Sequence, residues 1–70
     1  MKDWRGKAIK RGSSVVYPGR QGSVIWVVEA EVLEVKDEEI VVQPTRSTGD
    51  RAVSSRPVHI RNIDRVTVVG

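Results

Sequence analysis

The sequence predicts an all-β fold: a small five-stranded barrel with a bent, long second strand and a one-turn link before the last strand. Valine and isoleucine supply 19 of the 27 apolar residues, against one leucine and three alanines. Their β-branched side chains are stiff at χ1 and pack well on a pleated sheet. These residues fall into short groups separated by turn-forming residues. A chain of 70 residues forms one domain, so nearly every strand must contribute to its core.

The first strand is expected at Val15–Tyr17. Pro18-Gly19 follows it and suits a type II turn, because glycine accepts a positive φ at the third turn position. Upstream, Ala8-Ile9 is expected to form a short extended piece that turns at Lys10–Gly12. Residues 1–11 are expected to form a flexible or loosely packed N-terminal arm.

The second strand is the longest, at Ser23–Lys36. Apolar and polar residues alternate as far as Val32, and then the phase slips by one because Leu33 and Val35 are both apolar. Such a slip indicates a β-bulge or sharp bend, which a small barrel needs in order to close. A helix over residues 29–39 is the alternative, and the β-branched content favours the strand.

The remaining strands are short and closely linked. The third is expected at Ile40–Gln43, where Pro44 either ends it or confines it to a sheet edge, because proline has no N–H to donate. A polar, turn-rich stretch at residues 45–55 follows. A fourth strand, a tight turn and the last strand then occupy Val58–Arg61, Asn62–Asp64 and Arg65–Val69.

This order of strands resembles an SH3-like barrel more than an OB-fold. Gly12–Tyr17 resembles the opening strand of Tudor-like and KOW-like barrels, and Ala30–Val35 resembles their second strand. A second resemblance covers most of the chain, to short proteins of actinobacterial phages that have no assigned activity. It implies a phage origin and the host bacterial cytoplasm rather than a mechanism, and it rests on Trp4–Gly6, Val15–Arg20, Trp26 and Asp64–Val69.

Composition excludes several classes of protein. The chain has no cysteine, which excludes disulfides and cysteine-ligated zinc. Its longest apolar run, Val24–Val28, is far shorter than the roughly 20 residues that span a bilayer. The N-terminus has no apolar signal region. We therefore expect a cytoplasmic protein without a membrane partner.

Nothing in the sequence supports catalysis. The single histidine, His59, is expected on the polar face of a strand, and no serine lies in a nucleophile–base arrangement. The acidic run Asp37–Glu39 lacks the ligand spacing of a calcium loop and is interpreted as a solvated turn. We expect no enzyme, no metal and no cofactor.

The net charge of +3 conceals three unequal segments. Residues 1–20 carry +5, residues 21–45 carry −5 and residues 46–70 carry +3. This distribution supports either a basic face that binds a polyanion or strands of opposite charge that pair within the sheet. Both interpretations remain open from the sequence alone.

The basic residues are divided between these two interpretations. Arginine contacts phosphate in a bidentate manner. Arg56, Arg61 and Arg65 are expected to pair with glutamates of a neighbouring strand, Glu29, Glu31 or Glu34. The residues predicted to contact nucleic acid are Lys7, Lys10, Arg11, Arg20, Arg46 and Arg51.

The aromatic residues are few. Tyr17 and Trp4 are the candidate ligand-contacting aromatics, and a cage for a methylated cation would need them to converge. Trp26 alternates with Val24 and Val28 and is expected in the core. That placement leaves few platforms for base stacking, which disfavours a binder of single strands.

The function predicted from these features is that of a non-enzymatic binding module that contacts nucleic acid. The alternative is a protein-interaction module that binds a host protein or self-associates through a barrel groove or an edge strand. Val41–Pro44 and Val66–Val69 are the candidate edges.

Overall fold

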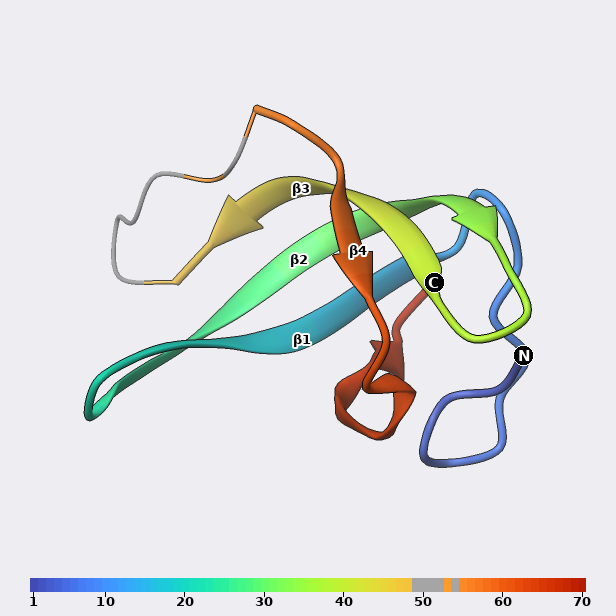
Figure 1. Ribbon diagram of the computed structural model, residues 1–70, viewed down its shortest axis with the longest axis horizontal. Helices are drawn as coiled ribbons and strands as arrows, with labels where there is room; N and C mark the ends of the chain where they lie inside the picture. Colours follow the sequence, from blue (N-terminus) through green and yellow to red (C-terminus); the bar gives the residue numbers. More distant parts are fainter. Residues whose placement is uncertain (49–52, 54) are drawn as a thin grey trace.

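The chain folds into five antiparallel strands that form a curled half-barrel, in a computed structural model that describes residues 1–48, 53 and 55–70. The strands lie in the sheet in the order β4-β3-β2-β1-β5, and a 3₁₀ turn links β4 to β5 (Figure 1). This arrangement confirms the predicted all-β barrel and its one-turn link. The elements are β1 (Ser14–Gln21), β2 (Val24–Val35), β3 (Ile40–Ser47), β4 (Val58–Ile60), η1 (Ile63–Arg65) and β5 (Thr67–Val68).

The bend predicted in the second strand is confirmed. Val32 lies opposite Val42 and Glu34 lies opposite Val41, so Leu33 is the extra residue of a bulge in β2. A second irregularity follows Pro44, where β3 carries an extra residue opposite β2. The strand therefore continues through the proline, and the sheet curves at both places.

The predicted turn at Pro18-Gly19 is wrong, because β1 continues through both residues. Pro18 lies opposite Val27, and the chain reverses only after Gln21, at Gly22, whose φ is 61°. Proline fits inside this strand because β5 pairs with β1 only at residues 15 and 16. Position 18 therefore faces an edge, and its missing N–H costs no ladder hydrogen bond.

The core consists almost entirely of β-branched side chains. Of its ten buried apolar residues, all but Ala30 are valine or isoleucine. Trp26 is only half-buried, which corrects the prediction that it fills the core. Its position in the alternation does place it on the concave face. Trp26 is only half-buried because β3 pairs with β2 only as far as Val28, so the outer part of the β1–β2 hairpin extends beyond the third strand.

Part of the segment expected to be a loose arm is instead packed against the barrel. The Asp3 side chain is fully buried, and its carboxylate accepts hydrogen bonds of 2.9 Å from the backbone N–H groups of Val68, Arg5 and Lys7. The bond from Val68, followed by those from Lys7 and Arg5, holds the pKa of Asp3 below its usual value, although burial opposes this. Ile9 is buried in the core. The N-terminal segment is thus tied to β5.

Candidate functional site

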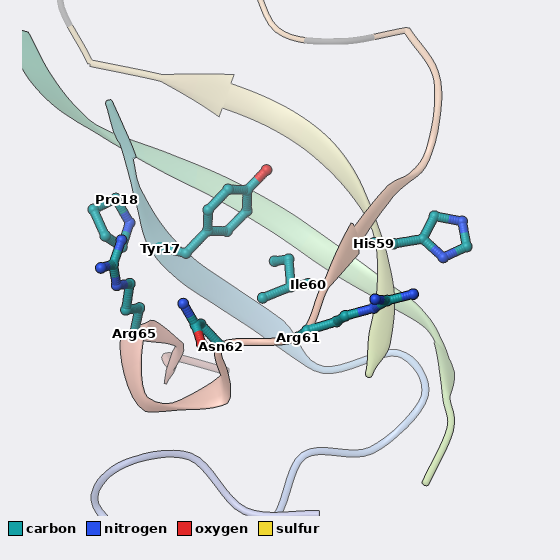
Figure 2. Close-up of a pocket in the computed structure, with 7 residues that line it drawn as sticks. All are labelled: Tyr17, Pro18, His59, Ile60, Arg61, Asn62 and Arg65. Atoms are coloured by element: carbon teal, nitrogen blue, oxygen red, sulfur yellow. The ribbon is translucent and has the colours of Figure 1, made fainter. Parts of the chain in front are cut away.

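A groove lies between β1 and the link from β4 to η1. It has a volume of about 560 Å³. Figure 2 shows Arg65 beside Pro18 and Arg61 beside His59, with the other lining residues between them. We call it the arginine groove, and it is lined by Tyr17, Pro18, His59, Ile60, Arg61, Asn62 and Arg65.

The single turn of η1 places the two arginines of this groove. The Arg65 N–H donates to the Asn62 carbonyl at 3.1 Å, and the Val66 N–H donates to the Ile63 carbonyl at 3.0 Å. Val66 is fully buried and fixes the end of the turn to the core. Arg61 precedes the turn and Arg65 closes it, so both border the same groove.

Among the described residues, neither guanidinium group of the groove forms a close ion pair, shorter than 4.0 Å, although the charge of Arg61 acts on the Glu39 carboxylate. Arg61 and Arg65 are both exposed. Between them the surface is less polar. Ile60 is half-buried against the core, and the Tyr17 ring projects from β1 with its hydroxyl directed away from Arg65 (Figure 2). Burial raises the pKa of Tyr17, so this ring stays neutral at pH 7.

The groove's β4 wall is held by a contact between His59 and Glu39. His59 Nδ1 lies 2.6 Å from Glu39 Oε2. This hydrogen bond is the main cause that holds the pKa of Glu39 below its usual value, and the charges of His59, Lys36 and Arg61 act in the same direction against burial. The pair connects β4 to the residue just before β3, which fixes the strand that carries Arg61.

A second groove, of about 330 Å³, lies next to the first on the concave side of the hairpin. The Trp26 indole rests on Gly19, where any side chain would collide with Nε1, Cε2 and Cζ2 of the ring. Glycine is required at position 19 for this close approach. Tyr17 lines both grooves. We call this one the tryptophan groove, and it is lined by Tyr17, Gly19, Arg20, Trp26, Val28, Pro44, Ser47, Val53 and Val58.

The basic residues predicted to contact nucleic acid do not form one face. Lys10 and Arg11 line a separate hollow beside the β2 bulge. Arg11 precedes β1 and Arg20 lies near its other end, so about 20 Å of strand, from Ser14 to Arg20, separates them. Lys7 lies in the N-terminal loop. Arg51 lies outside the described residues.

The expected pairing of the arginines is reversed in part. Arg46, which was assigned to binding, has its Nη2 atom 3.3 Å from Glu29 Oε2. Among the described residues, neither Arg61 nor Arg65 pairs with a glutamate of β2. Arg61 follows β4, which lies beside β3 and not beside β2, and Arg65 belongs to η1. Arg56 has an interaction partner. The sequence did carry a signal for the arginine groove, since Arg61 and Arg65 flank the predicted one-turn link.

The two aromatic residues proposed as ligand contacts lie apart. The exposed Trp4 indole donates from Nε1 to Thr67 Oγ1 at 2.7 Å, over β5, and Trp4 lines neither the arginine groove nor the tryptophan groove. The aromatic neighbour of Tyr17 is Trp26 instead. Tyr17 and Trp4 therefore do not converge as a cage would require.

Other chemistry is sparse in the part of the chain that the structure describes. No three His, Asp or Glu side chains there are grouped so that they could hold a metal ion. No helix among those residues has the length and apolar character to cross a membrane. Comparison with known protein families, curated proteins and solved structures finds no match.

Proposed function

We propose that the protein is a non-enzymatic module that binds nucleic acid through the arginine groove. The observation that carries this proposal is the pair of exposed guanidinium groups at Arg61 and Arg65, which border one groove and form no ion pair within 4.0 Å among the described residues. A guanidinium group matches a phosphate in a bidentate manner and is weakly hydrated, so contact with a phosphate backbone is favourable.

Contact of this kind is independent of base sequence. Phosphate contacts position a protein on nucleic acid, and their contribution falls steeply with salt because binding releases counterions. The resemblance to short actinobacterial phage proteins supports a role as a small phage accessory protein in the host cytoplasm.

Fluorescence anisotropy of a labelled oligonucleotide tests the proposal. Two double variants each remove two positive charges: Arg61→Gln with Arg65→Gln in the groove, and Lys10→Gln with Arg11→Gln in the separate hollow. We expect the groove variant to reduce the slope of log K against log salt by about 1.4–1.8, from about 0.7–0.9 per phosphate contact. The control variant should change it far less. Absence of binding at about 50 mM salt, or equal losses in both variants, would overturn the proposal.

A protein-interaction function is the second candidate, and an exposed apolar face favours it. Ile25 and Val27 are 66% and 46% exposed on the convex side of the hairpin, beside Pro18. Of the two predicted edges, Val41 and Val42 are covered by β4, whereas β5 does lie at the edge of the sheet. Size exclusion with light scattering tests self-association. A strictly monomeric protein at high concentration, unaltered by Ile25→Lys, would remove this form of the candidate.

A further inference from the structure

We infer that the nucleic acid is single-stranded and that its bases stack on Tyr17 and Trp26; this inference rests on the proposed function. The observation behind it is that Tyr17 lines both the arginine groove and the tryptophan groove. The two grooves therefore meet at Tyr17, with the guanidinium groups of Arg61 and Arg65 in one groove and the Trp26 ring in the other. Such a combination of a basic track and ring platforms is what binders of single strands use.

The strand register places the two rings next to each other. Gly19 lies opposite Trp26 and Tyr17 lies opposite Val28, so Tyr17 and Trp26 occupy diagonal positions on the same face of the hairpin. Diagonal neighbours in an antiparallel pair are about 7–8 Å apart, within reach of aromatic side chains. Because position 19 has no side chain, the indole lies down on the backbone of β1.

Positive charge lies on the Tyr17 side of this aromatic pair, where Arg61 and Arg65 border the surface. Arg20 also lines the tryptophan groove, but it lies opposite Ile25 on the other face of the hairpin, and its Nε donates to the Gly22 carbonyl at 3.2 Å. A backbone held at Arg61 and Arg65 would thus direct its bases toward the rings. A duplex hides the faces of its bases in the stack, whereas an extended single strand offers one face for each nucleotide.

The rest of the tryptophan groove also suits a base. Its walls include the apolar residues Val28, Pro44, Val53 and Val58, and the described lining residues carry no acidic side chain. An apolar wall around a ring platform favours a flat, uncharged group. The phosphates would remain at the arginines.

A titration of Trp26 fluorescence tests this inference without altering the site. In a Trp4→Phe variant, Trp26 is the only tryptophan, and a base that stacks on it quenches its emission. The probes are an oligodeoxyuridylate, an oligouridylate of the same length, a duplex DNA of that length and inorganic polyphosphate. We expect the single strands to quench, and the duplex and polyphosphate to bind without quenching. Quenching by only one of the two single strands supports the inference and shows whether the site prefers deoxyribose or ribose.

Substitutions at position 26 give a second measurement. Trp26→Leu should weaken binding of the quenching strand about tenfold, while polyphosphate binding stays unchanged. Trp26→Phe, which keeps a ring, should retain most of the affinity.

The outcomes separate this inference from the proposed function. If single strand and duplex bind equally, without quenching, and only Arg61→Gln with Arg65→Gln weakens them, single-strand stacking is overturned and the arginine groove stands. If no probe binds at low salt, the proposed function fails as well.

Discussion

Ile40 and Ile25 allow one substitution to be compared in two opposite environments. Ile40 is 0% exposed and lies between Val35 of β2 and Ile60 of β4, whereas Ile25 is 66% exposed on the hairpin. Removing one methylene from a packed core costs about 0.5–1.5 kcal/mol, and truncating Ile to Ala costs about 2–5 kcal/mol. A 70-residue domain has about 3.5–10 kcal/mol of stability in total, at about 0.05–0.15 kcal/mol per residue. Ile40→Ala should therefore remove a large share of it.

The same two substitutions at the exposed position, Ile25→Val and Ile25→Ala, should change the free energy of unfolding by less than about 0.5 kcal/mol. Urea denaturation followed by far-UV circular dichroism measures all four variants, and an unchanged m-value shows that the comparison concerns stability alone. Since Ile60 both contacts the core and lines the arginine groove, Ile40→Val should also weaken nucleic-acid binding slightly. The reasoning would be refuted if Ile25→Ala cost as much as Ile40→Ala, because residue 25 would then be covered in solution.

Three further predictions concern the tryptophan groove and the hydrogen-bonded carboxylates of Asp3 and Glu39. Gly19→Ala should displace the Trp26 indole, shift its emission maximum and reduce quenching by single strands, with no change in charge; an unshifted spectrum would contradict this. Folding lowers the pKa values of Asp3 and Glu39 from ordinary values of 3.8 and 4.5, so their contribution to stability is complete above those values and is lost as the pH falls through the lower folded values. The melting temperature should therefore decrease as the pH is lowered below these ordinary pKa values. Asp3→Asn should flatten this dependence, while Asp64→Asn, at an exposed carboxylate, should not.

The positions that the sequence predicted well are those where periodicity reports burial directly. The phase slip after Val32 marks the bulge at Leu33, because an extra residue in a strand exchanges its inward and outward positions. The short link between the last two strands is η1. Pro18-Gly19 was misassigned because a turn and an uncovered strand edge accept the same two residues. The pairing of Pro18 with Val27 and of Gly19 with Trp26 distinguishes these cases, and β5 covers β1 only as far as Val16, which leaves the edge uncovered.

The candidate site was harder to predict, since it depends on which strands are neighbours. Alternation placed Trp26 on the concave face correctly, but it could not show that β3 ends its pairing at Val28. Charge totals suggested that Arg61 would meet a glutamate of β2, yet β3 lies between them in the sheet. Arg46 pairs with Glu29 because a register shift brings them opposite each other. Strand neighbours and register depend on contacts between segments that are distant in sequence, so the local pattern of residues does not predict them.

Pro18 has a consequence for solubility. An open strand edge is a template on which other chains can add, and natural proteins often blunt such edges with proline. Beyond the two residues that β5 covers, the edge of β1 meets proline at position 18, and that position offers no donor to an incoming strand. The edge beside the arginine groove is thereby a poor template for the addition of a strand from another chain.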